Sequence, residues 1–419
     1  MELQNVKILE NVTAGDTYAK KVENFMLELG ITSEEIAAIR ENMLDDILEE
    51  DEYYLVEILR QKFNGLSFLT DAEKAAYIAE MEQAVNTHLV PAIEELNDGL
   101  DEYLGTLKKS EEGYLTVYEE GLKLYELKLA DLLGYKEFDL EEYIKVVDEA
   151  FLETYGISNG ATSIAGRTFK DIDKFLEANP ICDGTPDEMV AFLKEFAKTI
   201  VPELESDPEI YIKEMDEASA KVSNAVAYYM KSALDNTAGE YITLNPTKLG
   251  GKNDVLSTMA HEGYPGHLYA YCYAKETDLH PFSIISTSTA HGEGWATYVE
   301  FQLYEYAKTI HSDIDNYDIA MDYLIGNHLS SYMIEARIDL GIFCEGWEAD
   351  DINACLQRVM PGYSFNDVDG LYNQFLEMPT TFHAYGYCGC IEAERQICRY
   401  VQKASPKLCR FRGWRGERK

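Results

Sequence analysis

Apolar residues recur at helical intervals along much of the chain. One such stripe lies near the N-terminus, at Ile36, Ile39, Met43 and Ile47. Residues spaced by three or four positions lie on one face of an α-helix. The chain takes up the same helical pattern again from Asp254 onward. The pattern therefore predicts a mainly α-helical protein.

Capping motifs mark where several of these helices begin. In such a motif, a side chain that accepts a hydrogen bond is followed three residues later by glutamate. The pairs are Thr32 with Glu35, Thr70 with Glu73, and Asp139 with Glu142. A further start is expected at Thr185, because Pro186 behind it suits the first helical position.

Two short segments instead favour β-strands. Residues 210–212 follow Pro208, and residues 241–244 alternate after a turn signal at 236–239. The second segment ends about ten residues before the helix that carries the candidate chemistry. A strand edge beside such a helix can hold an extended peptide by backbone pairing. We therefore expect a small β-sheet beside the metal helix.

The charge balance and cysteine usage restrict the class of protein. The chain has 36 basic and 76 acidic residues, a net charge of −40, which disfavours nucleic acid and anionic lipid as partners. No apolar run is long enough to span a membrane, and no signal peptide is visible. Eight scattered cysteines form no disulfide framework. A cytoplasmic protein is expected, with an exported or lipid-anchored parent as the alternative if the N-terminus is truncated.

Four regions are expected along the chain. They are a helical region at 1–155, helices with short strands at 156–250, a catalytic helical region at 251–400, and an atypical tail at 401–419. The tail holds seven basic residues and one acidic residue. A functional basic tail is one interpretation; a truncated or frame-shifted end is the one we favour.

The strongest chemical signal is the run His261-Glu262-Gly263-Tyr264-Pro265-Gly266-His267. Helical zinc peptidases place two histidine ligands four residues apart, on one face, with glutamate beside the first as general base. Here the second histidine is six residues on, which turns it about 120° away on an ideal helix. Pro265 and Gly266 permit a kink or an inserted turn. The hypothesis requires that this break brings His267 back beside His261.

A downstream carboxylate completes the candidate site. Glu293 lies between two glycines, 26 residues after His267, and a His-His-Glu set leaves one zinc position open. Glu300 lies two helical turns further on the same face and suits a supporting role behind a ligand. A single histidine is more often structural than a ligand, so the prediction rests on the joint pattern.

A later segment supplies candidates for stabilising an oxyanion. Tyr385 is the first choice, with Tyr387 and His383 as further candidates; a tyrosine-lined packing surface is the alternative. Arg337 could contact a substrate carboxylate, although a structural ion pair with Asp339 is the simpler explanation.

Three runs together resemble the bacterial family catalogued as domain of unknown function 885. They are H-E-G-Y-P-G-H from His261, E-G-W-A-T-Y-V-E from Glu293, and A-R-I-D-L-G-I from Ala336. The resemblance implies a gluzincin-like metallopeptidase: a large helical fold with a deep groove, and zinc held by His261, His267 and Glu293 with Glu262 as base. The family often has a second histidine after the one matching His267, where this chain has Leu268.

These observations predict zinc-dependent hydrolysis of peptide bonds in oligopeptides. The alternatives are a helical protein that binds peptides without cutting them, a truncated inactive homologue, and a protein in which zinc is only structural. The last is disfavoured because structural zinc sites are usually rich in cysteine. The sequence does not determine the preferred side chains, exo- or endo-cleavage, or the oligomeric state.

Overall fold

The computed structural model describes residues 54–104, 121–216, 219–220, 223, 225–235, 239–285, 289–359 and 368–392. The predicted cap at Thr32 and the basic tail at 401–419 lie outside these residues. The chain divides into two compact units. The first comprises the described parts of 1–122, 216–223 and 365–377, and the second those of 123–215, 224–364 and 378–419.

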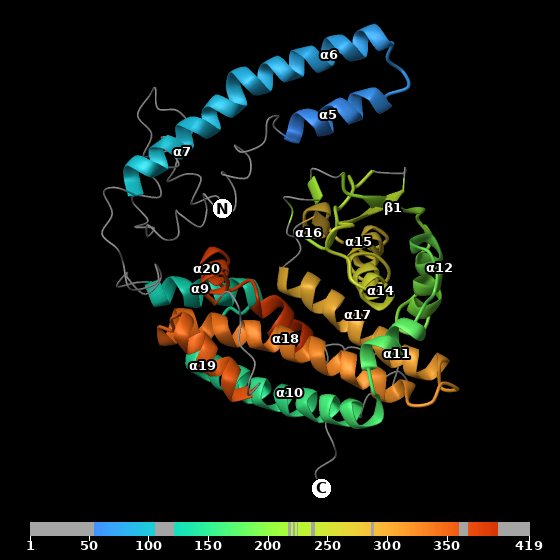
Figure 1. Ribbon diagram of the computed structural model, residues 1–419, viewed down its shortest axis with the longest axis vertical. Coiled ribbons are helices and arrows are strands. Elements are labelled where there is room, and N and C mark those ends of the chain that lie inside the picture. The colour runs from blue at the N-terminus through green and yellow to red at the C-terminus, as the bar shows by residue number, and fades with distance from the viewer. Residues whose placement is uncertain are drawn as a thin grey trace. The chain divides into compact units, whose positions relative to one another are not determined.

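The first unit is helical. Its elements are α5 (Tyr54–Gly65), α6 (Asp71–Ala84), the π-helical turn η2 (Val85–Leu89), α7 (Val90–Leu104) and α20 (Val368–Glu377). Thr70 and Glu73 form the predicted capping box at the start of α6. An ion pair of 2.7 Å between Arg60 and Glu82 joins α5 to α6, and the two helices form a hairpin (Figure 1).

The second unit holds the candidate chemistry and most of the helices. They are α9 (Gly121–Leu133), α10 (Leu140–Thr168), α11 (Ile172–Ala178), α12 (Pro186–Ala197), α14 (Lys252–Glu262), α15 (His267–Lys275), α16 (Pro281–Ile285), α17 (Thr289–Ile310), α18 (Tyr317–Glu345), α19 (Ala349–Val359) and the π-helix η3 (Ala384–Glu392). The caps predicted at Asp139 and Thr185 begin α10 and α12, with Pro186 in the first turn.

Helix α10 packs lengthwise against α18, as Figure 1 shows. Every fourth residue of its first half is buried: Tyr143, Val147, Phe151 and Tyr155. The helix continues to Thr168, so it crosses the boundary expected between residues 155 and 156. The expected division at this point therefore falls within a single helix that is buried on both sides of it, at Tyr155 and at Ser158.

A three-stranded sheet lies beside α14. Its strands are β1 (Ile210–Glu214), β2 (Ala227–Tyr229) and β3 (Glu240–Leu244), in the order β1-β3-β2. Strand β1 runs parallel to β3, with Ile210 opposite Glu240, and β2 runs antiparallel to β3. The two strands predicted from sequence correspond to β1 and β3. Strand β2 was missed because three residues are too few to show a period.

The mainly α-helical class and the small sheet, which lies beside α14, are therefore confirmed. The core beneath the site combines residues from several elements, including Ile242 of β3, Leu256 and Met259 of α14, and Leu303 of α17. Among the described helices, none is both long enough and apolar enough to cross a bilayer.

Candidate metal centre

The break predicted within the His261–His267 run is present. Helix α14 ends at Glu262 and α15 begins at His267, with a cis peptide bond before Pro265 in the turn between them. A Cβ atom on Gly266 would overlap the carbonyl oxygens of Ala260 and His261. The turn therefore closes so tightly against the last turn of α14 that only glycine fits there.

Two neighbouring elements hold this turn in place. A Cβ atom on Gly263 would overlap the side chain of Ile242 in β3, so the sheet packs directly on the turn. From the other side, the indole Nε1 of Trp295 donates a 2.8 Å hydrogen bond to the carbonyl oxygen of Pro265. The tryptophan of the second motif thus stabilises the turn within the first.

The two histidine rings meet as the hypothesis required. Their centroids are 4.8 Å apart and their planes lie at 87°. His261, Glu262 and His267 each offer one ligand atom, and these atoms all lie within 4.8 Å of one another. Six residues of separation are compatible with one shared site because the inserted turn reverses the chain between two helices.

Glu293 of α17 joins the same site. Its Oε2 lies 3.2 Å from Nε2 of His261 and 3.4 Å from Nε2 of His267. Two ligands on one tetrahedral zinc ion, with bonds near 2 Å, are about 3.3 Å apart. The donor types and their spacing therefore fit zinc, with Glu293 as the carboxylate nearest to both rings.

Charge in the site favours a cation between these side chains. Burial alone would raise the pKa of Glu293, but its hydrogen bonds to His261 and His267 lower that pKa to about 2. Burial opposes a positive charge on His261, yet Glu293 and Glu300 together raise the pKa of its ring to about 10.

Glu300 lies behind His261, in the supporting position predicted for it. Its buried carboxylate accepts a 2.6 Å hydrogen bond from Nδ1 of His261. Nδ1 of His328 lies 3.3 Å from the other oxygen, and the hydroxyl of Tyr332 donates to the carboxylate at 3.3 Å. Such a carboxylate fixes the ring orientation and leaves Nε2 directed at the metal position.

Glu262 is oriented by strand β2. The backbone N–H of Tyr229 donates a 3.0 Å hydrogen bond to Oε2 of Glu262. The Tyr229 hydroxyl donates to the buried Glu240, which also pairs with Lys275 at 2.9 Å. Burial raises the pKa of Glu262, while the neighbouring His261 and His267 oppose that rise.

Tyr385 lies at the site. Its ring is 6.4 Å from that of His261 and stacks on Tyr332 at 5.7 Å. Burial raises the pKa of its hydroxyl, and the carboxylates of Glu293 and Glu262 and a hydrogen bond with Glu293 raise it further. The hydroxyl therefore stays protonated and can donate a hydrogen bond.

Glycines bring η3, which carries Tyr385, close to α17 and α18. A Cβ atom on Gly389 would lie 2.6 Å from the side chain of Thr297, and one on Gly294 would lie 3.0 Å from that of Cys388. A Cβ atom on Gly386 would lie 2.5 Å from the carbonyl oxygen of Tyr332. Side chains at these positions would push η3 away from both helices.

The structure places His383 and Tyr387, the further oxyanion candidates, in buried contacts with α10 and α18. His383 is fully buried, with Nδ1 2.7 Å from the hydroxyl of Tyr143 and Nε2 3.2 Å from Asp339. Tyr387 is also buried, and its ring packs edge-on against Tyr143 at 4.8 Å. With both ring nitrogens engaged, His383 anchors the start of η3 instead of facing a substrate.

Arg337, the residue expected to contact a substrate carboxylate, is engaged by other side chains of the protein. Its guanidinium group is buried, pairs with Asp148 at 2.6 Å and with Glu345 at 2.9 Å, and lies 4.4 Å from the ring centroid of Trp347. The structural ion pair was the better explanation, but the partner is not Asp339. Two residues apart on a helix, Arg337 and Asp339 point in different directions.

A family model described as a bacterial protein of unknown function, DUF885, matches residues 15–366. The match spans most of the chain and includes the broken helix and Glu293. The chain belongs to the DUF885 family. No protein with a curated description matches the chain.

Two solved structures match the chain. One is a proposed lipoprotein from Colwellia psychrerythraea, with a TM-score of 0.68 and 15% identity over 97% of this chain and 74% of that one. The other is a proposed lipoprotein of unknown function from Shewanella oneidensis, with a TM-score of 0.48 and 16% identity over 96% of this chain and 76% of that one. At this identity the first match shows a shared fold and no more.

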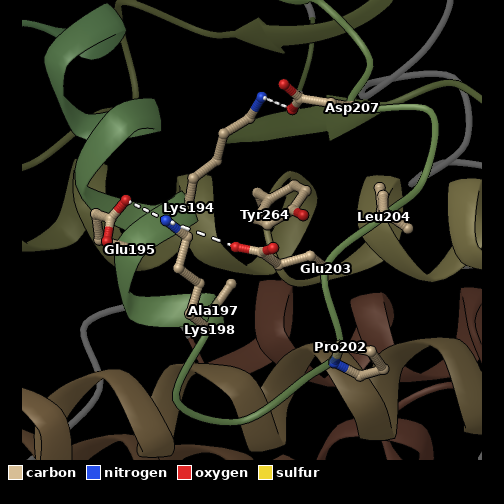
Figure 2. A pocket seen from close by; sticks show the side chains of 9 residues that line it. All are labelled: Lys194, Glu195, Ala197, Lys198, Pro202, Glu203, Leu204, Asp207 and Tyr264. Atoms are coloured by element: carbon tan, nitrogen blue, oxygen red, sulfur yellow. Dashed lines mark hydrogen bonds and ion pairs between the residues drawn. The ribbon is translucent and has the colours of Figure 1, made fainter.

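A cavity of about 270 Å³ lies beside the turn between α14 and α15 of this DUF885 protein. Figure 2 shows the ring of Tyr264 facing it, with Lys194 paired to Asp207 at 2.7 Å and Lys198 to Glu195 at 2.6 Å. None of the candidate metal ligands lines this cavity. It is therefore distinct from the metal centre, and the groove expected there stays a prediction.

Proposed function

We propose that the chain is a zinc-dependent peptidase of the gluzincin type, with zinc held by His261, His267 and Glu293 at the base of a substrate groove. The supporting observation is the position of the Glu293 carboxylate, 3.2 and 3.4 Å from the two Nε2 atoms. Glu262 shares the site but is hydrogen-bonded to Tyr229. These distances suit Glu293 as ligand and leave Glu262 for proton transfer.

Zinc supplies a Lewis acid that polarises a carbonyl group and makes water more acidic. Glu262 is the residue that would take the proton from the attacking water. Tyr229 fixes one of its oxygens, Oε2, so the orientation of the carboxylate is set while Oε1 can receive a proton. Burial raises the pKa of Glu262 and so makes it a stronger base than an exposed glutamate.

Tyr385 would stabilise the negative charge that develops on the carbonyl oxygen. Its pKa is raised by burial and by the surrounding carboxylates, so the hydroxyl is a hydrogen-bond donor at neutral pH. A preorganised donor directed at developing charge lowers the barrier most when water is excluded. The stacked ring of Tyr332 holds Tyr385 in position from behind.

The edge of β2 favours a peptide as substrate. The backbone N–H of Asn245 donates to the carbonyl oxygen of Val226. Hydrogen-bonded positions alternate along an antiparallel pair, so Val226 and Tyr228 are the residues on this side that bond to the neighbouring strand. The backbone groups of Ala227 and Tyr229 then point away from β3, and the Tyr229 N–H reaches Glu262. The carbonyl groups on this edge could pair with an extended peptide whose scissile bond lies at the metal.

The proposal is tested by the Glu262→Gln variant. Glutamine is isosteric and can still accept a hydrogen bond from Tyr229, but it cannot accept a proton from water. We expect stoichiometric zinc by elemental analysis, and a loss of roughly 10²–10⁴-fold in the rate of cleavage of a mixed peptide pool. Cleavage would be followed by mass spectrometry of the digest.

Glu149→Gln is the matched control, because Glu149 is an exposed carboxylate on α10. It should retain both zinc and activity. Full activity in Glu262→Gln would remove Glu262 from the proposed role. Zinc binding without any cleavage by the unmodified protein would support a peptide-binding protein instead.

A further inference from the structure

One face of α18 carries a polar stripe beside the candidate site. It consists of His328, Tyr332, Glu335 and Asp339. Spacings of four, three and four residues place these side chains above one another on a helix. In a helix that is otherwise largely buried, each polar member of such a stripe needs a partner or access to water.

Three members of the stripe have hydrogen-bonding partners. His328 and Tyr332 both contact the carboxylate of Glu300. Asp339 is fully buried, accepts hydrogen bonds from the hydroxyl of Tyr125 and the backbone N–H of Thr380, and lies beside His383. These contacts show that the stripe faces the metal centre at one end and the start of η3 at the other.

Glu335 is the exception. Within the described residues it has no hydrogen bond and no ion pair, although it lies between Tyr332 and Asp339. Its side chain is partly exposed, unlike that of Asp339. Burial without a compensating partner raises the pKa of its carboxyl to about 7.

The carboxylate of Glu335 lies near the residue proposed to stabilise the oxyanion. The pKa of Tyr385 is raised first by burial and then by carboxylates that include Glu335. The close approach of Gly386 to Ala336 and to the backbone of Tyr332 places this part of α18 directly against η3. Glu335, one turn along α18 from Tyr332, therefore lies on the part of the helix that packs against η3, where Tyr332 stacks on Tyr385.

The charges around the site are almost all of one sign. Carboxylates come from Glu262, Glu293, Glu300 and Glu335, and in the described parts of the chain no lysine or arginine pairs with any of them. Arg337 is directed to Asp148 and Glu345. A divalent metal ion neutralises only two of these four charges, so a substrate carboxylate would be repelled here while a cation would be attracted.

We propose that Glu335 binds a positively charged nitrogen group of the substrate, either a free α-amino group or the side chain of lysine or arginine. The inference rests on the proposed peptidase function, because it assumes a peptide at the metal centre. Pairing with the substrate supplies the partner that Glu335 lacks. It makes Glu335 a determinant of substrate specificity.

The test measures binding in the Glu262→Gln background at pH 7.5, so that no peptide is cut. Three peptides of one sequence, all amidated at the C-terminus, are titrated by calorimetry: free at the N-terminus, N-acetylated, and N-acetylated with one added lysine. We expect a charged peptide to bind about tenfold more tightly than the acetylated one. Adding Glu335→Gln should bring that ratio close to one.

Comparison of the three peptides identifies which positively charged group of the peptide is bound. Preference for the free N-terminus alone indicates the α-amino group, and recovery of binding by the lysine peptide indicates a side chain. Asp318→Asn, which removes an exposed charge at the other end of α18, should leave the ratio unchanged and so controls for total charge. An unchanged ratio in Glu335→Gln, no preference for either charged peptide, or no binding of them overturns the inference. Zinc content and cleavage by the unmodified protein show separately whether the peptidase proposal stands.

Discussion

Four glutamates around the candidate centre have the same chemistry in isolation but different properties in the folded protein. Burial raises the pKa of Glu262 and Glu335. Glu300 is also buried and Glu293 is half-buried, but hydrogen bonds to histidines lower the pKa of each to about 2. Sequence spacing identified Glu262, Glu293 and Glu300. It did not identify Glu335, because nothing local indicates that a residue on α18 will lack a partner.

The unpaired state of Glu335 predicts how stability depends on pH. Its pKa is raised from 4.5 to about 7 on folding, so between these values the native state binds more protons than the unfolded state and stability falls as pH rises. Glu335→Gln removes this penalty. At pH 8 the variant should be more stable to chemical unfolding, by on the order of 2 kcal/mol, and the difference should shrink toward pH 5. A variant less stable at pH 8, or a difference that does not depend on pH, contradicts the prediction.

At the scale of elements, the centre depends on an interrupted helix. Helices α14 and α15 each contribute one histidine, α17 contributes Glu293, and the turn of 263–266 sets the angle between the first two. The presence of the break could be predicted from Pro265 and Gly266. The sequence did not predict how closely this break approaches the preceding turn, or that it packs on Ile242 and Trp295. Those two partners come from β3 and α17.

Gly266→Ala should disrupt this arrangement. The added methyl group would overlap the carbonyl oxygens of Ala260 and His261, so the turn must open and His267 must move. We expect loss of stoichiometric zinc and a thermal midpoint several degrees lower. The matched control is Gly160→Ala in α10, where a Cβ atom meets nothing within 4 Å and alanine should stabilise by about 0.5–1 kcal/mol. Normal zinc content in Gly266→Ala would show that the turn tolerates a side chain.

At the scale of the whole molecule, the dominant property is a net charge of −40. Such an excess keeps a protein soluble, but it destabilises the compact state through repulsion between like charges. Many of the acidic residues are exposed on helices, including Glu141, Glu149 and Glu153 of α10. The charge therefore acts on the stability of the fold.

Salt should stabilise this protein. Raising NaCl from about 0.05 to about 0.5 M shortens the screening length to a few ångströms and weakens repulsion between surface carboxylates. The thermal midpoint, measured at pH 7.5 by circular dichroism, should rise by several degrees. Sucrose at matched osmolarity controls for effects of the solution that do not depend on charge. A midpoint that falls with salt would show that favourable ion pairs outweigh the net repulsion.

The sequence by itself determined the features that depend on neighbouring residues. Helical periodicity and the caps at Thr70, Asp139 and Thr185 predicted a mainly helical chain, because helix formation and capping are local. The two longer strands and the break between His261 and His267 were likewise visible in short windows. The three motifs also identified the family, which the match over residues 15–366 confirmed.

Only the tertiary structure decided which side chains meet. His383 anchors η3 because Tyr143, 240 residues away in the chain, lies against it, and Arg337 is withdrawn from the site because Asp148 and Glu345 pair with it. Tyr229 reaches Glu262 through a strand too short to recognise. In each case the deciding partner is distant in sequence and is brought into place by packing of the core, so no local pattern carries the information.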